Sequence, residues 1–353
     1  MENKDRYSFF SLAGFSYSRG AVYLNGGERL FSSNSKFTEV PSKLLTDLPS
    51  LISRIRSAAS QNSKIVVLSP SHLLVPVIKI ITGKSIILDA GWSLTEAEIA
   101  RWHGIGSVPR IVKCLIIDFL AFQLASKIIV ETNHQKSFIS SRFLIRKNKI
   151  IVLMTGFDEV NFNEKSKKPF ELEDTNGTVS QPIVLFRGSY TNEAGFELLS
   201  EVSKRMENID IQFIISSNRI PRELVFGKNT ILISRRISNR EMKYLYEIAT
   251  VCIGQITNRP RLKNTIPHKA FEAAFFGKPY LSSDTLGIRE FLPENNQCYY
   301  LEESSVACLE KAILEITANA KIQSDLSLNI AKRYKEVATQ ATLSLKFFEI
   351  ISN

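Results

Sequence analysis

Cysteine and histidine, which build disulfide frameworks and most metal centres, are scarce in this sequence. The 353 residues include four cysteines and four histidines. Cys114, Cys252, Cys298 and Cys308 are far apart, lie in apolar stretches and show no CxxC spacing. This pattern argues against a disulfide scaffold or a cysteine-ligated metal and predicts reduced thiols in a cytosolic compartment.

Motifs for metal-dependent or nucleophilic hydrolysis are also missing. The sequence has no HExxH, no arrangement that resembles a nucleophilic triad, and no Asp-x-Asp at the end of a predicted strand. We expect His72 at a helix start and His103, beside Trp102 in a glycine-rich loop, at a structural or surface position. His134 carries little signal. We therefore expect no metal and no bound cofactor.

No uninterrupted hydrophobic run is long enough to cross a bilayer. The most apolar stretch, residues 112–131, contains Lys113, Asp118, Gln123 and Lys127. Its uninterrupted pieces are far shorter than the ~20 residues that a span requires, so we expect a buried helix and a buried strand. The first ten residues are polar and charged with no long apolar segment, and we expect no signal peptide.

Acidic residues are outnumbered by basic ones. The chain has 45 Lys and Arg against 35 Asp and Glu, a formal net charge of +10 and a pI near 9.3. Such a chain attracts anions, among them nucleic acid, an anionic membrane surface or a phosphate-bearing small molecule. Its basic residues are spread out, without a dense tract interleaved with aromatics, so we expect no nucleic-acid partner.

Short β-branched runs alternate with helical patterns from the start of the chain. After a first strand in YSFFSLA, strands are predicted at residues 64–69, 85–89, 127–131 and 149–154, with helices between them. These strands are nearly continuous apolar runs, as expected where helices cover both faces of a parallel sheet. The pattern predicts a doubly wound α/β domain.

A second α/β unit is expected after a polar interruption. Residues 163–181 are charged and lack apolar periodicity, so we place the domain junction there. A long helical stretch over about 322–350 can reach back across the junction. The predicted strands of the second unit are 182–188, 210–216, 229–234, 251–255 and 279–283.

The sequence thus predicts two Rossmann-like doubly wound domains, over 1–165 and 166–335, and a C-terminal helix, 336–353, that packs back toward the first domain. Parallel α/β sheets bind ligands at the carboxyl ends of their strands. We therefore expect a site in a cleft between the two domains.

One stretch of the second unit, TIPHKAFEAAFFGKPYL at residues 265–281, has the outline of a short buried helix and the strand after it. Pro267 suits the first helical position, Thr265 can cap from just upstream, and Gly277 supplies the stop. The expected buried stripe is Phe271, Ala274 and Phe275.

Three ionisable residues stand at the start of this helix. Lys269 and Glu272 are three residues apart and His268 and Glu272 four apart, so all three can share a face near its N-terminus. One interpretation is a solvated salt bridge worth about 0.2–0.5 kcal/mol. The other is a ligand site, because a helix N-terminus favours an anion such as a diphosphate and a nearby carboxylate can accept hydrogen bonds from ribose hydroxyls.

The stretch resembles the C-terminal-domain signature of family 4 glycosyltransferases, which have the two-domain GT-B fold. That signature is a Pro-x-Lys-x-x-Glu helix followed by small residues, Gly-x-Pro and a strand. Its counterparts are Pro267, Lys269, Glu272, Gly277 and Pro279, followed by YLSS.

Three further segments match the family in the same order. TGFDEVNF, at 155–162, resembles the segment that closes the first domain. Residues 237–255 resemble the helix and strand before the signature, and 284–292 the Gly…Glu segment after it. The resemblance covers roughly residues 60–350, with its motifs after residue 150.

The resemblance implies roles for several residues. Glu272 would accept hydrogen bonds from the donor's ribose hydroxyls, and Lys269 would lie near the diphosphate. The backbone near Arg236 and Ile237 would meet the nucleobase. In the segment after the signature, Gly287 and Glu290 match as structural supports.

The sequence also departs from the family pattern. Where the family commonly has a second glutamate that contacts the donor sugar, this chain has Asn264. With Gly188 aligned, the usual diphosphate-binding Arg and Lys are replaced by Ser189 and Ala194. Two cations that stabilise the departing nucleoside diphosphate are therefore missing from their usual positions.

Nearby basic residues can substitute for them. Arg187 ends the first strand of the second domain, and Arg259, Arg261 and Lys263 lie just before the signature. We predict that Arg187, with Arg261 or Lys263, neutralises the diphosphate. The alternative for 258–263 is a solvated basic loop.

The first domain offers weaker candidates. In the family a glycine-containing loop after the first strand faces the acceptor, which here implicates Ser18, Arg19 and Gly20 in GFSYSRG. Gly20 can equally be only a tight turn. Asp89, at the end of a later strand, is either a general base for the acceptor hydroxyl or a cap for the helix from residue 93 onward.

The resemblance implies a retaining, metal-independent glycosyltransferase of the hexosyltransferase type. It would move a sugar from a UDP- or GDP-linked donor to a glycan or lipid-linked acceptor in cell-surface polysaccharide or glycolipid synthesis. The expected location is the cytoplasm, with peripheral docking at the inner face of an anionic membrane. Two alternatives stay open: a catalytically inactive GT-B module in a larger assembly, and a sugar-nucleotide epimerase.

Overall fold

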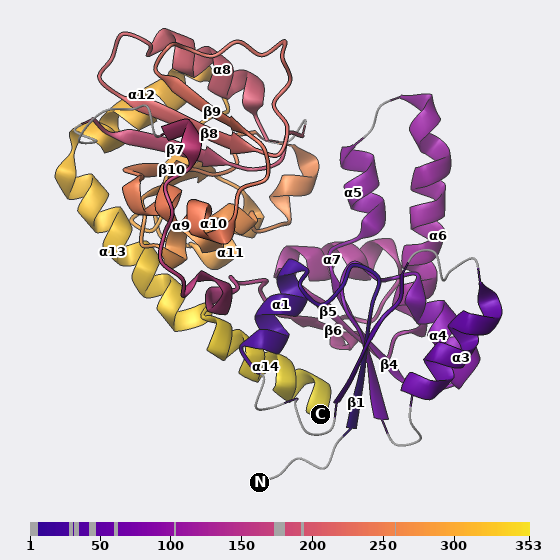
Figure 1. Cartoon of the computed structure of the whole chain (residues 1–353). Coiled ribbons are helices and arrows are strands. Elements are labelled where there is room, and N and C mark those ends of the chain that lie inside the picture. The colour runs from indigo at the N-terminus through magenta and orange to yellow at the C-terminus, as the bar shows by residue number, and fades with distance from the viewer. Residues whose placement is uncertain are drawn as a thin grey trace. The chain divides into compact units, whose positions relative to one another are not determined.

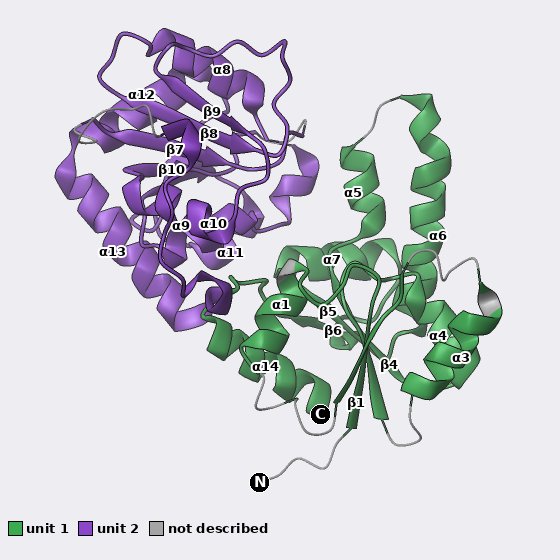
Figure 2. Ribbon diagram, viewed as in Figure 1, with its two compact units in different colours: residues 1–158, 339–353 green, residues 159–338 purple. Residues whose placement is uncertain are grey.

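A computed structural model describes residues 6–27, 31, 35–41, 47–59, 63–101, 104–172, 181–191, 194–257 and 259–353 (Figure 1). The chain divides into two compact units, residues 1–158 with 339–353 and residues 159–338 (Figure 2). Each unit contains a six-stranded sheet with helices on its faces. The predicted fold class, two Rossmann-like doubly wound α/β domains, is confirmed.

The first unit has the strand order β2-β1-β3-β4-β5-β6, and every neighbouring pair is parallel. Its strands are β1 (Arg6–Ser11), β2 (Ser35–Glu39), β3 (Ser63–Val67), β4 (Ile86–Gly91), β5 (Lys127–Val130) and β6 (Ile150–Val152). Its helices are α1 (Ser18–Asn25), α3 (Leu48–Ala58), α4 (Leu74–Thr82), α5 (Leu94–Ala100), α6 (Val108–Leu124), α7 (Asn133–Arg142) and α14 (Gln340–Ser352), with short 3-10 turns η2 (Ile105–Ser107) and η3 (Lys147–Lys149).

The last helix of the chain, α14, completes the core of this first unit. Phe347 stacks on Tyr23 of α1 with ring centroids 4.7 Å apart. Leu343 and Ile351 are buried in the same apolar cluster as Phe9 of β1. Helices α1 and α14 lie side by side in Figure 1, and a Cβ on Gly26 would come within 2.6 Å of α14.

The second unit has the strand order β12-β11-β10-β7-β8-β9, again parallel throughout. Its strands are β7 (Ile183–Arg187), β8 (Gln212–Ser217), β9 (Thr230–Ser234), β10 (Val251–Ile253), β11 (Tyr280–Ser283) and β12 (Tyr299–Leu301). Its helices are α8 (Phe196–Arg205), α9 (Asn239–Ile248), α10 (His268–Phe275), α11 (Leu286–Phe291), α12 (Val306–Ala318) and α13 (Ala320–Val337), with 3-10 turns η4 (Glu159–Phe162), η5 (Phe170–Leu172) and η6 (Pro260–Lys263).

Some elements differ from the prediction. The predicted loop over 14–20 ends early, because α1 already begins at Ser18. The predicted helix over about 322–350 is two helices, since the Thr339 hydroxyl accepts from the backbone of Thr342 and starts α14 anew. Helix α3 and strand β12 have no counterpart among the predicted elements. None of the described helices is long and apolar enough to cross a membrane.

Candidate functional site

Helix α10 forms where its sequence predicts it. Phe271 and Ala274 are buried, and the half-buried Phe275 contacts Tyr334 edge-on with ring centroids 5.8 Å apart. Gly277 has a φ of +61°, the left-handed conformation that ends helices and favours glycine. The predicted cap by the Thr265 side chain is wrong: the N-cap is Pro267, and no side chain caps the helix.

The carboxylate of Glu272, in the second turn of α10, is the centre of a buried cluster. Glu272 is 1% exposed. Arg187 Nη1, at the end of β7, donates to both of its oxygens at 2.8 and 3.0 Å. The Tyr246 hydroxyl of α9 donates to Oε2 at 2.5 Å, and His268 Nδ1 lies 2.9 Å from Oε1.

This cluster shifts the pKa values of Glu272, Arg187 and Tyr246. Burial works to raise the pKa of Glu272, but Arg187, His268 and Tyr246 together lower it to about 2. Burial works against the charge of Arg187, yet Glu272 raises its pKa. Burial raises the pKa of Tyr246, which therefore remains a hydrogen-bond donor. Glu272 and Arg187 form a permanently charged pair.

The geometry shows Glu272 engaged by other residues of the protein. Both oxygens already accept hydrogen bonds from the protein, and the carboxylate is turned away from solvent. A ribose hydroxyl would have to displace one of these partners. In this structure Glu272 holds Arg187 in place instead of offering a free acceptor.

Lys269 lies at the point of the sheet where the order of the strands changes direction. The chain runs from β7 to β8 and β9 on one side and returns to β10 on the other, so the β7/β10 boundary is the switch point where such sheets bind ligands. Lys269 Nζ donates to the Gly254 carbonyl, just after β10, at 3.0 Å. A Cβ on Gly188, just after β7, would lie 3.3 Å from the same nitrogen.

The ammonium of Lys269 also sits over the ring of Phe186, 3.9 Å from its centroid. Burial lowers the pKa of Lys269 to about 7. Its charge therefore changes near neutral pH and is sensitive to an anion placed beside it.

A hollow of about 380 Å³ opens at the carboxyl ends of β7, β8 and β9. It is lined by residues at or just after the ends of the three strands and by the first turn of α9: Arg187, Gly188, Ser189, Ser216, Ser217, Asn218, Arg235, Arg236, Ile237, Asn239 and Met242. The structure therefore brings together four residues that the sequence singled out, Arg187, Gly188, Arg236 and Ile237.

The hollow is cationic. Three arginines and no carboxylate are among the described residues that line it. Arg235 is held from behind, since it donates to both oxygens of Glu171 at 2.8 Å and to Glu241 at 2.7 Å. The charges that balance Arg187 and Arg235 thus stand outside the lining, which leaves the hollow suited to an anionic ligand with hydrogen-bonding groups.

The other predicted donor residues lie elsewhere in the second unit. Arg261 and Lys263 are on η6, and Asn264 ends that turn. None of the three is among the described residues that line the hollow. Lys263 is exposed, which fits the solvated-loop alternative. Ser189 lines the hollow and Ala194 is buried, so neither position supplies a cation.

Gly287 supports the segment that leads into α10. A Cβ at this position of α11 would lie 2.4 Å from the carbonyl oxygen of Thr265. Only glycine allows α11 to approach this backbone so closely. The predicted structural role of Gly287 is thereby supported.

In the first unit Arg19 and Asp89 are engaged with each other instead of facing an open site. Both are fully buried and form an ion pair, with Arg19 Nη2 2.7 Å from Asp89 Oδ1 and Nε 3.0 Å from the same oxygen. Arg19 Nη1 also donates to the Thr155 hydroxyl at 2.9 Å. Both oxygens of Asp89 accept hydrogen bonds from Arg19, so the geometry gives no support to a role as the acceptor's base. The alternative of a helix cap is also wrong, because Ser93 caps α5.

The neighbours of Arg19 do not form an acceptor loop either. Ser18 and Gly20 belong to the first turn of α1, and Gly20 is buried with an ordinary φ instead of forming a tight turn. The side chain of Ser18 lies outside the described residues. A glycine at each end of GFSYSRG suggests a loop, and the helix forms because Ala21, Val22 and the residues after them bury one face.

No histidine is among the described residues that line the hollow, although His268 contacts Glu272 beside it. His72 is fully buried, 3.9 Å from Asp118, and burial lowers its pKa. His134 lies in α7, and His103 falls outside the described residues. Among the residues that the structure describes, no group of three or more His, Cys, Asp or Glu is placed to hold a metal ion.

Several residues of the site were not predicted from the sequence. Tyr246 and Arg235 organise its charges, and Ser216, Ser217 and Asn218 line it. Their place in the sequence could have indicated them, because polar residues at the end of a buried parallel strand lie at the edge of the sheet where ligands bind.

Comparisons with known proteins show the fold. No family model and no curated protein sequence match the chain. Solved structures do match over nearly its whole length: sucrose-phosphate synthase from Thermosynechococcus elongatus has a TM-score of 0.74 at 14% identity and covers 99% of this chain and 98% of its own. Anabaena HepE in complex with UDP-glucose has a TM-score of 0.70 at 12% identity, covering 98% of each chain.

A third solved structure, UDP-GlcNAc 2-epimerase from Neisseria meningitidis bound to UDP-GlcNAc, matches with a TM-score of 0.57 at 13% identity, covering 99% of this chain and 100% of its own. The chain therefore has the two-domain GT-B fold that these solved structures share.

Proposed function

We propose that this protein binds a UDP- or GDP-linked sugar in the cationic hollow and transfers the sugar, with retention of configuration, to a hydroxyl of a glycan or lipid-linked acceptor. The observation that carries the proposal is the lining itself: Arg187, Arg235 and Arg236 without a carboxylate, beside Lys269 at the switch point. A nucleoside diphosphate supplies the negative charge and the hydrogen-bonding base that such a hollow fits.

Arg187 and Lys269 would stabilise the departing diphosphate. The bond between the anomeric carbon and the β-phosphate oxygen breaks, and its electron pair stays on that oxygen. Fixed cations that meet this developing charge lower the barrier. Arg187 is suited to the task because Glu272 and its partners hold the guanidinium at the end of β7.

Retention fits a reaction without a protein base. The acceptor oxygen bonds to the anomeric carbon on the face that the diphosphate leaves, and the acceptor proton passes to the leaving phosphate oxygen. This route is supported by the burial of Asp89 against Arg19, which removes the carboxylate that the sequence suggested as a base.

Thermal unfolding with nucleotides tests the binding step. A ligand that binds only the folded protein stabilises it by about 2.7 kcal/mol at 100 times its Kd. We expect UDP or GDP to raise the Tm of the wild type and to have at least tenfold lower affinity for Arg187→Ala. Arg205→Ala on α8, an exposed arginine 3.6 Å from Glu310, is the matched control and should bind as the wild type does. Equal affinity of all three proteins would refute the proposed site.

An epimerase is the second candidate, because the same fold occurs in a UDP-GlcNAc 2-epimerase. Inversion of a sugar carbon needs an acid and a base that face the sugar. NMR of the donor incubated without an acceptor distinguishes the two: a transferase releases nucleoside diphosphate or leaves the sugar intact, and an epimerase converts it to its stereoisomer.

The inactive-module alternative makes a different prediction. A module without activity keeps a folded hollow but neither hydrolyses nor transfers the sugar of any donor. Donor-dependent release of nucleoside diphosphate that is lost in Lys269→Met would exclude it.

A further inference from the structure

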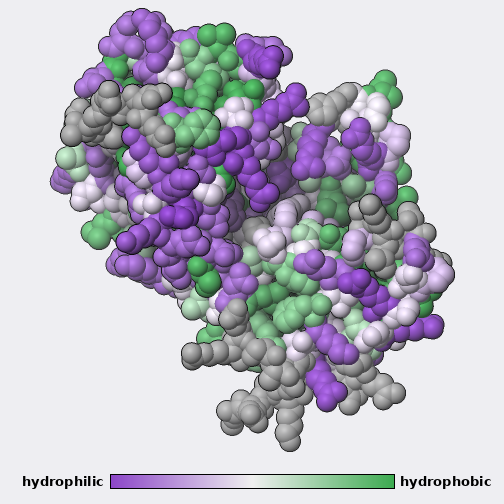
Figure 3. Space-filling view, viewed as in Figure 1, coloured by the Kyte–Doolittle hydropathy of each residue, from purple (hydrophilic) through white to green (hydrophobic). Residues whose placement is uncertain are grey.

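Strand β2 is one outer edge of the sheet in the first unit. Among the described strands it pairs with β1 alone. Figure 1 shows β1 toward the viewer with β5 and β6 behind it, so the β2 edge lies on the near side of the sheet. The same view in Figure 3 shows apolar side chains, in green, among polar ones on this face of the unit.

The backbone groups of β2 alternate between the two sides of the strand. The Val40 amide, just after β2, donates to the Ser11 carbonyl of β1 at 2.8 Å. Because the N–H and C=O of one residue point to the same side and successive residues alternate, every second residue before Val40 also faces β1. The N–H and C=O groups of Ser35, Phe37 and Glu39 therefore point away from the sheet. Such a row is a template on which an extended peptide adds as a further strand.

A groove of about 860 Å³ runs between β2 and helix α3. Lys36 and Thr38 of the strand and Ser53, Arg54 and Ser57 of the helix are among the residues that line it. Helix α3 has 11 residues and is therefore roughly 16 Å long, the length of about five residues in an extended strand. The groove thus has room for the side chains of one added strand.

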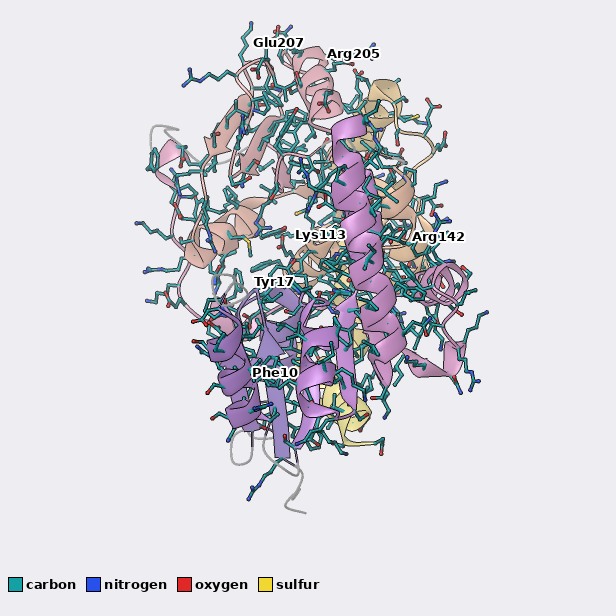
Figure 4. The ribbon with its side chains drawn as sticks, turned by 90° about the vertical axis from the view of Figure 1, so that its right-hand side faces the viewer. Phe10, Tyr17, Lys113, Arg142, Arg205 and Glu207 are labelled. Atoms are coloured by element: carbon teal, nitrogen blue, oxygen red, sulfur yellow. The ribbon has the colours of Figure 1, made fainter. Side chains whose placement is uncertain are left out.

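Helix α3 is fixed beside this groove. Leu51 and Ile55 are buried in the same apolar cluster as Phe10 of β1, which is labelled in Figure 4. The Lys36 ammonium donates to the Ser57 carbonyl, in the last turn of α3, at 3.1 Å. The groove is therefore formed before any ligand arrives.

The groove is cationic. Arg54 is exposed and, in the part of the chain that the structure describes, makes no ion pair. None of the described lining residues is acidic. The nearby carboxylates are engaged elsewhere: Asp47 accepts from the Ser50 amide at 3.3 Å and hydroxyl at 2.6 Å, and Glu39 accepts from the Phe15 amide at 3.3 Å. Acidic side chains of an added strand would complement this groove.

The opposite face of β2 is apolar at its centre. The Phe37 ring stacks on Phe9 with centroids 5.1 Å apart and meets Phe15 edge-on at 5.4 Å, yet 46% of Phe37 is exposed. Because side chains alternate along a strand, Phe37 lies on the other face from Lys36 and its groove. Aromatic or β-branched residues across from an aromatic residue stabilise a sheet. An added strand should therefore be apolar on this face.

We propose that a partner protein adds an extended segment to β2, with acidic side chains in the groove beside Arg54 and apolar side chains against Phe37. Such a segment alternates acidic and apolar residues. A second copy of this chain fits less well, because a two-fold axis at Phe37 would place both α3 helices, each with Arg54 and Arg56, on the same face of the joined sheet. The inference goes beyond the proposed transfer reaction and does not depend on it.

Fluorescence polarisation with a synthetic peptide tests the charge of the segment. The probe is a fluorescein-labelled peptide in which valine and glutamate alternate. We expect saturable binding to the full chain at low salt, and about tenfold weaker binding of the peptide that has lysine in place of glutamate. Arg54→Glu should weaken binding of the glutamate peptide about tenfold.

The matched control is Arg142→Glu, at an exposed arginine of α7 in the same unit. Figure 4 shows Arg142 on the opposite side of this unit from Phe10. This variant should bind the glutamate peptide as the wild type does. Thermal unfolding of both variants verifies that they are folded.

Backbone methylation of the probe tests the addition of a strand. One version is methylated at the valine nitrogens and the other at the glutamate nitrogens, so each loses N–H groups on one side only. We expect one version to bind about tenfold more weakly than the other, because an added strand uses only the N–H groups that face β2. Weaker binding of the valine version would indicate antiparallel addition, and of the glutamate version parallel addition.

Four results would overturn the proposal. The first is no saturable binding of the glutamate peptide to the folded wild type at low salt. The second is equal weakening by Arg54→Glu and Arg142→Glu, which would mean that general charge is responsible. The third is equal affinity of the two methylated versions, which would mean that an acidic ligand binds without adding a strand. The fourth is a wild-type dimer, by light scattering, that the probe converts to monomers, since a second copy would then cover β2.

Discussion

Arg187 at the end of β7 and Glu272 in α10 are joined by two hydrogen bonds from one guanidinium nitrogen, at 2.8 and 3.0 Å, across 85 residues of sequence. The arginine is 31% exposed and the carboxylate 1%, so the pair has a buried end and an accessible end. The buried carboxylate keeps the accessible cation oriented.

Replacing Glu272 with Gln should destabilise the second unit. The change removes the charge that balances Arg187, and hydrogen bonds to charged groups contribute about 1.5–3 kcal/mol each to stability. The measurement is urea unfolding near pH 7. Glu223→Gln, at an exposed carboxylate, is the control and should change stability by less than about 0.5 kcal/mol.

The stability difference between the wild type and Glu272→Gln should depend on pH. The folded-state pKa of Glu272, about 2, is below its ordinary value of 4.5, so its contribution is complete above about pH 5 and is lost as pH falls through about 2. The stability difference between wild type and Glu272→Gln should therefore shrink on acidification over this range. A difference that stays constant down to pH 2 would contradict the paired carboxylate.

Lys269 should make nucleotide binding depend on pH near neutrality. Its pKa of about 7 in the folded protein lies below the ordinary 10.5, so the ammonium is charged below about pH 7 and neutral above it. We expect the affinity for a nucleoside diphosphate to fall as pH rises from 6 to 8, by calorimetry. In Lys269→Met the affinity should change less between pH 6 and pH 8.

The control for this slope is Lys332→Met, at an exposed lysine of α13. It should keep the wild-type pH dependence, including any part that comes from titration of the phosphate itself. If Lys269→Met keeps the full slope as well, the ammonium does not face the ligand.

The Arg19–Asp89 pair should matter for stability and not for chemistry. Removing one member of a buried pair costs about 3–5 kcal/mol, whereas replacing both by apolar residues is often near neutral. Asp89→Asn should therefore lower the Tm strongly, and Arg19→Met/Asp89→Leu should recover much of the loss. Transfer activity, measured per folded molecule, should return with the Tm. A stable double variant that is inactive would restore Asp89 as a catalytic candidate.

Gly287 should tolerate no side chain. A Cβ would meet the Thr265 backbone at 2.4 Å, and overpacking of this kind costs about 1–3 kcal/mol. Gly287→Ala should lower the free energy of unfolding by that amount. Gly106→Ala is the control, because a Cβ there would have no neighbour within 4 Å.

The sequence predicted the parts of the structure that depend on neighbouring residues. Pro267, Gly277 and the apolar spacing between them specify α10, and continuous apolar runs specify the parallel strands. Some of the residues that line the hollow could be predicted, because the sequence shows where a buried strand ends.

The direction in which Glu272 points could not be read in this way. Its partners Arg187 and Tyr246 are 85 and 26 residues away, and they meet it only because β10 pairs with β7. The same holds for Arg19 and Asp89, which are 70 residues apart. A charged residue at a strand or helix end looks equally suited to a ligand or to another side chain until the strand order is known.

The place of α14 has a consequence for synthesis on the ribosome. The unit that contains the first 158 residues takes Leu343, Phe347 and Ile351 into its core, and these residues are translated only after the whole of the second unit. The second unit, residues 159–338, is complete before they leave the exit tunnel. The unit whose synthesis begins first therefore cannot complete its core until α14 has left the exit tunnel, and until then it exposes the apolar surface that α14 will cover.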